Sequence, residues 1–178
     1  MDELEILYDV TAQLEELGIP YMLTGSMAMN YYAEPRMTRD IDLVVDLQEG
    51  EISKLVSGFQ PDYYVSSETV REAVRKRSMF NLIHRERVLK IDFVLRKRTR
   101  YREVEFERRQ RVHLGSEEVD VVRKEDLIIS KIAWAEDSQS EVQKRDVRNL
   151  MATGYDEDYL EHWLKELNLY DFTENWLE

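Results

Sequence analysis

The stretch that decides the fold reads Arg36-Met37-Thr38-Arg39-Asp40-Ile41-Asp42-Leu43-Val44-Val45. Its second half alternates between acidic and apolar side chains, which is typical of a strand that buries one face. Asp40 and Asp42 then share the other face, with Cα atoms roughly 6.5 Å apart. Two carboxylates this close repel each other unless a cation lies between them, and Mg²⁺ prefers oxygen ligands. The stretch therefore predicts a half-buried strand that presents a pair of candidate metal ligands.

A second stretch, Val88–Leu95, shows the same alternation, with Asp92 on the face opposite to its apolar residues. If this strand neighbours the first, Asp92 joins Asp40 and Asp42 in one cluster. Three carboxylates on two strands can hold two metal ions during an in-line displacement at phosphorus. The competing interpretation is that the Asp-x-Asp pair only decorates the solvated face of an amphipathic strand.

A Gly-Ser turn precedes the acidic strand by fifteen residues. Gly25 and Ser26 follow an apolar strand, 21–24, and lead into a short helix, 27–33. Gly permits close approach of the backbone, and the free N–H groups of a helix start favour a phosphate. Ser26 adds a hydroxyl, or it serves only as the N-cap of an ordinary turn. Beside the carboxylates, the turn predicts a phosphate-binding loop next to a metal site.

The composition fits a folded domain of ordinary size. The chain has 178 residues, 43% of them hydrophobic, which is enough for one domain with a real core. It has no Cys, which excludes disulfides, thiol catalysis and cysteine-based zinc sites. The first residues are acidic rather than basic, and no apolar run approaches the length of a bilayer span. We therefore expect a cytoplasmic protein that does not engage a membrane.

Charge is distributed unevenly along a chain whose net charge is −12. Residues 71–111 hold 15 Lys and Arg against 6 Asp and Glu, whereas residues 155–178 hold 8 acids and one Lys. A basic segment inside an acidic chain is a candidate surface for a polyanion such as RNA. The alternative is that these cations pair across strands and with the acidic ends of the chain.

Hydrophobic periodicity divides the chain into a mixed part and a helical part. The expected strands are 21–24, 41–46, 78–84, 88–95, 109–114 and 118–122, and the expected helices are 2–17, 27–33, 48–59, 69–76, 125–135, 140–152, 156–167 and 172–177. This pattern predicts an α/β (α+β) fold. A mixed β-sheet flanked by helices occupies residues 1–122, and a C-terminal helical part, 123–178, packs on it.

The Gly25-Ser26 turn, the Arg39–Leu43 segment and the later strand carboxylate Asp92 resemble the nucleotidyltransferase fold of the polymerase-β superfamily. The resemblance implies that Gly25 and Ser26 hold an incoming nucleoside triphosphate (NTP). It also implies that Asp40, Asp42 and Asp92 bind Mg²⁺ or Mn²⁺. Arg39, just before the metal ligands, is a candidate contact for phosphate oxygens, and the alternative is that it pairs with Glu34 or faces solvent.

Two later segments, Glu125–Ile132 and Lys144–Leu150, are similar to the AbiEii-type nucleotidyltransferases. Members of that group are often toxins of toxin–antitoxin or phage-abortive systems, which implies a cognate antitoxin or regulator as partner. The resemblance places Lys131 and Asp146 in the active site, with the Lys131 ammonium neutralising the triphosphate. The chain departs from the group at Asn149, where a second Asp is common.

We therefore expect an enzyme that moves a nucleoside monophosphate from an NTP to a hydroxyl acceptor. The acceptor is an RNA 3′ end, a protein or a small molecule; the basic segment 71–111 favours RNA, whereas the net charge of −12 disfavours it. The alternative is a non-catalytic nucleotide-binding or partner-binding module that retains the fold. A plain structural domain is the third hypothesis.

Overall fold

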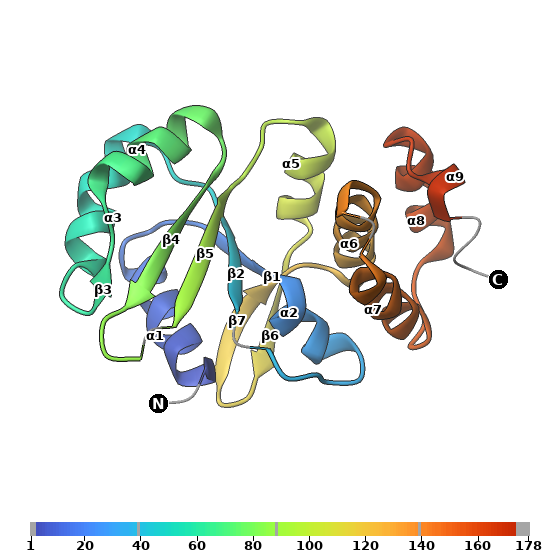
Figure 1. Cartoon of the computed structure of the whole chain (residues 1–178), viewed down its shortest axis with the longest axis horizontal. Coiled ribbons are helices and arrows are strands. Elements are labelled where there is room, and N and C mark those ends of the chain that lie inside the picture. The colour runs from blue at the N-terminus through green and yellow to red at the C-terminus, as the bar shows by residue number, and fades with distance from the viewer. Residues whose placement is uncertain (1–2, 39, 88, 139, 174–178) are drawn as a thin grey trace.

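The two strands that carry the predicted metal ligands lie side by side at the centre of a seven-stranded mixed sheet (Figure 1). The order across the sheet is β3-β4-β5-β2-β1-β7-β6. The strands are β1 (Tyr21–Thr24), β2 (Ile41–Val45), β3 (Tyr63–Tyr64), β4 (Met79–His84), β5 (Lys90–Leu95), β6 (Gln110–Leu114) and β7 (Glu117–Val121). Strand β2 is parallel to β5 and antiparallel to β1.

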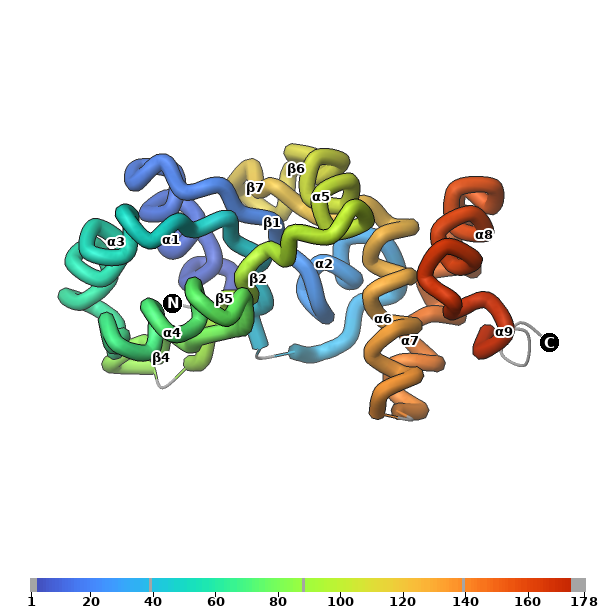
Figure 2. Tube along the Cα trace, turned by 90° about the horizontal axis from the view of Figure 1, so that it is seen from above, coloured from blue at the N-terminus to red at the C-terminus, as the bar shows by residue number. Residues whose placement is uncertain are grey.

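Helices pack on the sheet and extend the molecule at one end. They are α1 (Glu3–Glu16), α2 (Gly25–Tyr32), α3 (Ile52–Phe59), which follows the 3-10 turn η1 (Glu49–Glu51), α4 (Ser67–Lys76), α5 (Arg100–Glu107), α6 (Lys124–Ser138), α7 (Glu141–Met151), α8 (Glu157–Glu166) and α9 (Tyr170–Thr173). Figures 1 and 2 both place α3 and α4 at one end of the molecule and α6 to α9 at the other. This computed structural model describes residues 3–38, 40–87, 89–138 and 140–173.

The apolar faces of β2 and β5 point into the main core. Phe93 of β5 stacks on Phe80 of β4 with ring centroids 5.1 Å apart, and it meets Phe59 of α3 edge-on at 6.0 Å. All three rings are buried, and burying an aromatic side chain contributes several times the free energy of a surface contact. Because the apolar residues fill this core, Asp42 and Asp92 project from the opposite face of the sheet, where α2 packs.

The predicted fold class, a mixed sheet flanked by helices, is confirmed. In the described part of the chain, residues beyond β7 form helices, and the expected boundary between 122 and 123 stays a prediction. The helix expected at 27–33 was predicted to start two residues too late, because α2 begins at Gly25 itself. Helix α5 was not expected at all. Most of the expected helix 172–177 lies outside the described residues. None of the described helices is both long and apolar enough to cross a bilayer.

Candidate active site

The Gly-Ser turn packs directly against the acidic strand. Strand β1 pairs with β2 so that Thr24 lies opposite Asp42, and α2 starts at the next residue. Gly25 has a φ of +68°, in the left-handed region that favours glycine. A β-carbon at this position would lie 2.1 Å from Asp42 Oδ2, far inside van der Waals contact. Both the backbone angle and the contact therefore require glycine here.

Asp42 and Asp92 lie opposite each other in the parallel β2–β5 ladder. Asp92 is buried, and its carboxylate is held by two neighbours that the sequence analysis did not identify. The Lys90 ammonium lies 2.9 Å from Asp92 Oδ2, and the Asn81 side-chain amide donates to Asp92 Oδ1. Asp40 is exposed just before the start of β2. The expected meeting of Asp42 and Asp92 on one face is thus confirmed.

The surroundings of Asp42 raise its pKa to about 6. Burial is the largest cause, and repulsion from Asp92 and Asp40 adds to it, whereas Lys131 and Lys90 oppose it. Ionising Asp42 beside two other carboxylates costs free energy, and a cation bound among them would offset that cost. The three Asp side chains therefore fit Mg²⁺ or Mn²⁺ by donor chemistry.

Within the described residues, no group of three His, Cys, Asp or Glu side chains is placed to hold a metal ion together as it stands. Asp92 instead makes the contacts with Lys90 and Asn81 described above. The three-carboxylate metal site therefore stays a prediction.

Ser26 belongs to a second cluster, which joins α2 to the C-terminal helices. Arg36 Nη2 donates to Ser26 Oγ at 2.5 Å and to Asp146 Oδ2 at 3.1 Å. Lys131 Nζ donates to the same Asp146 oxygen at 2.9 Å. Ser26 is not the N-cap of α2, because Thr24 holds that position and makes no side-chain capping bond. Arg36 therefore links the predicted triphosphate loop to Lys131 and Asp146, the two site residues predicted on later segments.

Lys131 and Asp146 form a buried ion pair, with 3% and 1% of their surfaces exposed. Burial favours the neutral form of Asp146, yet hydrogen bonds from Lys131 and Arg36 outweigh it and hold its pKa below the usual range. Burial lowers the pKa of Lys131, and Asp146 opposes this. Lys131 and Asp146 are thus in direct contact, while their roles in catalysis stay predictions.

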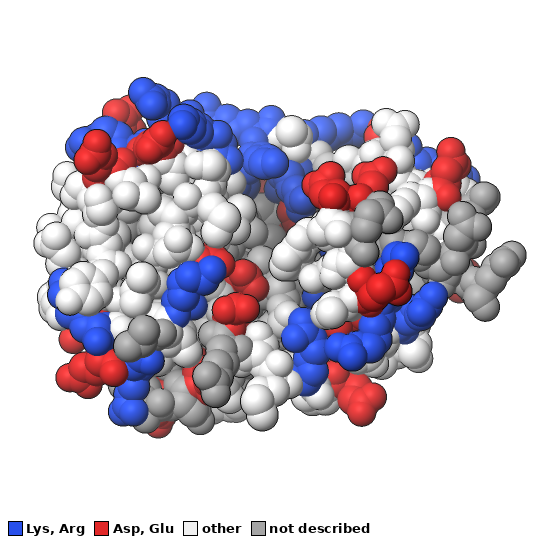
Figure 3. Space-filling view, viewed as in Figure 1, with Lys and Arg blue, Asp and Glu red and all other residues white. Residues whose placement is uncertain are grey.

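A cavity of about 260 Å³ opens beside the carboxylates. Gly25, Asp42 and Lys131 line it together with apolar residues of the sheet and of α6, so one cavity joins three of the predicted site residues. Figure 3 shows acidic side chains gathered beside a hollow in the middle of this face. The cavity is a candidate site for a small group next to the predicted phosphate loop.

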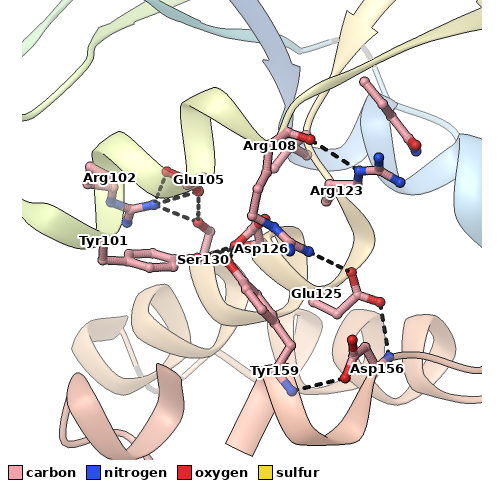
Figure 4. Close-up of polar contacts among 12 residues, drawn as sticks. Tyr101, Arg102, Glu105, Arg108, Arg123, Glu125, Asp126, Ser130, Asp156 and Tyr159 are labelled. Atoms are coloured by element: carbon pink, nitrogen blue, oxygen red, sulfur yellow. Dashed lines mark hydrogen bonds and ion pairs between the residues drawn. The ribbon is translucent and has the colours of Figure 1, made fainter. Parts of the chain in front are cut away.

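The unexpected helix α5 supplies part of the cavity wall. Arg102 Nη1 donates to Glu105 Oε1 at 2.7 Å and to Ser130 Oγ at 2.8 Å, which ties α5 to α6 (Figure 4). Burial raises the pKa of Glu105 although Arg102 opposes it. No sequence signal singled out this cluster.

Lys90 could have been found from the sequence, since it lies two residues before Asp92 on the same face of a strand. Arg39 lies outside the described residues.

Comparison with known proteins identifies the fold. No protein-family model and no curated protein matches the chain. Among solved structures, a likeness with a TM-score of 0.54 and 17% identity links it to an antigenic nucleotidyltransferase-like protein from Paracoccidioides brasiliensis, covering 84% of this chain and 73% of that one. The chain therefore has a nucleotidyltransferase fold.

Two further likenesses are to antibiotic-modifying or resistance proteins. The lincosamide antibiotic adenylyltransferase LnuA, solved with lincomycin, is 16% identical with a TM-score of 0.55, over 85% of this chain and 96% of its own. The antibiotic-resistance factor ANT(2'')-Ia is 13% identical with a TM-score of 0.61, over the whole of both chains. At such identities the likeness describes the fold alone.

Proposed function

We propose that this protein is a nucleotidyltransferase that moves a nucleoside monophosphate from an NTP to a hydroxyl acceptor. One observation carries the proposal. The glycine of a strand–turn–helix loop closes against Asp42, and Asp42 lies in register with Asp92 on the neighbouring strand. Neither feature is needed to build the core, because both carboxylates lie on the face away from it.

The proposed reaction is a single displacement at the α-phosphorus. The acceptor oxygen forms a bond to this phosphorus while the bond from phosphorus to the oxygen that bridges the α- and β-phosphates breaks. Pyrophosphate leaves with the electron pair of that bond. The proton of the acceptor hydroxyl passes to a carboxylate of the site, for which Asp92 is the candidate.

The chain's own residues bind and orient the triphosphate. The backbone at Gly25 approaches it closely, and the Ser26 hydroxyl and Arg36 guanidinium donate to phosphate oxygens. Lys131 supplies positive charge from the cavity wall, and Asp146 holds its ammonium in place. Arg39 is a further candidate phosphate contact. A Mg²⁺ or Mn²⁺ ion bound by Asp40, Asp42 and Asp92 would supply the positive charge that stabilises the transferred phosphoryl group.

We retain the AbiEii-type subgroup as the finer proposal, on the strength of Lys131 and Asp146. It brings with it a toxin role in the cytoplasm and a cognate antitoxin as partner. RNA 3′ ends, protein hydroxyls and small molecules are all acceptors consistent with the proposed chemistry. The lincomycin bound by LnuA is a small molecule, which supports a small acceptor by likeness of fold only.

The test is transfer of labelled nucleotide by the purified protein. We expect incorporation from at least one of the four NTPs with Mg²⁺ or Mn²⁺ and a pool of cellular RNA, protein and small molecules. The Asp42→Asn variant should be inactive, and the Asp62→Asn variant, which changes an exposed Asp between α3 and β3, should keep full activity. Equal activity in the Asp42 variant would contradict the proposal.

The non-catalytic module remains a second candidate on one specific observation. Asp92 is held by Lys90 and Asn81 rather than free to coordinate a metal. Such a module would show a thermal shift with NTP yet no label in any acceptor pool. It would also show the same shift with and without Mg²⁺, because its nucleotide contacts would not include a metal.

A further inference from the structure

The cations of the basic segment 71–111 divide into a paired and an unpaired group. Many pair with acids of other segments, as expected from the alternative hypothesis: Arg96 with Asp46, Arg108 with Asp126, Arg109 with Asp120, and Arg111 with Glu15. Two further pairs, Lys90 with Asp92 and Arg102 with Glu105, lie within β5 and within α5. Arg71, Arg75 and Arg98 behave differently. In the described part of the chain they are exposed and have no carboxylate within ion-pair distance. The fold therefore leaves a subset of the cations available.

Arg71, Arg75 and Arg98 line one open groove of about 1040 Å³ between α4 and the segment that follows β5. Arg77 also lines it, and we call these four residues, Arg71, Arg75, Arg77 and Arg98, the arginine groove. Figure 3 shows a band of Lys and Arg side chains running from α4 toward the central hollow. The groove also contains three acids, Glu49, Glu68 and Glu72. Of these, Glu72 is already paired with Lys76.

Arg77 adopts a backbone conformation that is unusual for its residue type. Its φ of +49° lies in the left-handed region, which costs an L-residue roughly 1–2 kcal/mol. Its Nη1 atom is buried without a hydrogen-bond partner and lies 3.8 Å from Asp46, which Arg96 already contacts at 2.9 Å. Burial and the nearby Arg98 and Arg96 lower the pKa of Arg77. Positive charge is thus in excess at this point.

Adjacent residues of one segment line the arginine groove and the active-site cavity. The segment after β5 contributes Arg96 and Lys97 to the cavity and the next residue, Arg98, to the groove. Trp134 of α6 also lines the cavity, and it is 57% exposed although it is a large aromatic side chain. Proteins bind single-stranded nucleic acids by stacking bases on aromatic rings and by contacting phosphates with cations, and this chain exposes an aromatic ring in the cavity and arginines in the groove.

We propose that the arginine groove binds the phosphate chain of a single-stranded polynucleotide, whose terminal nucleoside enters the cavity and presents its hydroxyl. This assignment of the acceptor rests on the proposed function. A cavity of about 260 Å³ holds one small group and not the end of a duplex. The net charge of −12 repels polyanions elsewhere, so attraction depends on this local excess of arginine.

The test measures binding without catalysis. Fluorescence anisotropy of a labelled 12-nucleotide RNA, and of DNA of the same sequence, is recorded without NTP or divalent metal from 50 to 200 mM salt. Four phosphate contacts predict a slope of log K against log salt of about −3. The Arg71→Gln/Arg98→Gln variant should bind at least about tenfold more weakly and flatten the slope by about 1.4. Binding of both RNA and DNA supports the phosphate chain as the recognised chemistry, and RNA alone adds a 2′-hydroxyl requirement.

A matched control is the Arg85→Gln/Arg87→Gln variant. It removes the same charge from the turn between β4 and β5, at the opposite end of these strands from the arginine groove. Circular dichroism of both variants checks the fold. Equal loss of binding in the two variants, or a wild-type slope near zero, would overturn the proposal.

Failure of this inference and failure of the proposed function give different results. Binding at the groove without transfer of labelled nucleotide to any acceptor supports the surface and contradicts the enzyme. Transfer to a small molecule or protein by a chain that does not bind either oligonucleotide retains the enzyme and overturns the surface. A 3′ end blocked by periodate oxidation should bind as before and accept no label.

Discussion

Gly25 lies so close to the carboxylate of Asp42 that a β-carbon on residue 25 would sit 2.1 Å from Asp42 Oδ2. The contact joins the first residue of α2 to β2 and restricts where the carboxylate can point. The atom that would be displaced is the end of a side chain rather than backbone. A larger residue at position 25 should therefore move Asp42 instead of unfolding the sheet.

We predict that Gly25→Ala abolishes nucleotide transfer at a modest cost in stability. The left-handed φ should cost about 1–2 kcal/mol of unfolding free energy, and Asp42 should turn away from the triphosphate. Gly18→Ala is the matched control, because Gly18 has a φ of +65° with no atom within 4 Å of its added β-carbon. Urea unfolding should show similar losses for both variants, and only Gly25→Ala should lose activity. If Gly25→Ala keeps its activity, the Gly25 turn is not needed for nucleotide transfer.

Asp42→Asn should lower the transfer rate about a thousandfold or more, which corresponds to at least about 4 kcal/mol of transition-state stabilisation. The substitution keeps the shape of the side chain and removes one charge. Without metal, it should also raise the midpoint of thermal unfolding, because it relieves repulsion with Asp92 and Asp40. Single-turnover kinetics and calorimetry of the same preparation measure both effects. A variant that is slower and also less stable would show that Asp42 serves the fold.

Alternation along two short stretches was enough to predict the centre of the sheet. It placed Asp42 and Asp92 on one face, and the observed register puts them directly opposite each other. The glycine turn was recognisable too, since glycine before a helix start implies a special backbone position. The alternation repeats every two residues and the turn occupies only a few residues. Both features can therefore be predicted from short stretches of sequence.

The missing parts depend on contacts between distant segments. Helix α5 was overlooked because its buried residues include Glu105, so no apolar stripe marks it. Asn81 was not connected to Asp92, because that pairing follows from the β4–β5 register. The link from Arg36 to Asp146 spans 110 positions and requires α7 to pack beside α2. No periodicity in the chain encodes such a contact.

The Lys131–Asp146 pair should contribute a stability that depends on pH. Hydrogen bonds hold the pKa of Asp146 below the ordinary value of about 3.9, so the unfolded chain binds more protons than the native one in acid. This contribution is complete above about pH 4 and is lost as the pH falls through the lowered pKa. Unfolding free energy measured from pH 2 to 7 should therefore fall less steeply in acid for Asp146→Asn than for wild type.

The same substitution should lower stability at neutral pH by about 3 kcal/mol, because it leaves the Lys131 ammonium buried without a counter-charge. Gln143 Oε1, 3.2 Å from Lys131 Nζ, remains as an acceptor and limits the loss. The Lys131→Met/Asp146→Asn double variant removes the stranded charge and should be more stable than Asp146→Asn alone. If the double variant is the less stable of the two, the pair is not the source of the loss.

A last prediction concerns how the C-terminal helices attach to the cavity wall. The Tyr159 hydroxyl of α8 donates to Asp126 Oδ1 at 2.7 Å, and Asp126 of α6 is completely buried (Figure 4). Tyr159→Phe removes this donor and leaves a buried carboxylate oxygen with weaker partners, so it should cost about 1–3 kcal/mol of unfolding free energy. Tyr155→Phe is the control, since its hydroxyl makes no hydrogen bond to the described residues. We expect Tyr159→Phe alone to lower the unfolding midpoint, while both variants transfer nucleotide at the wild-type rate well below that midpoint. Loss of activity in a fully folded Tyr159→Phe protein would instead show that the docking of α8 controls the geometry of the active-site cavity.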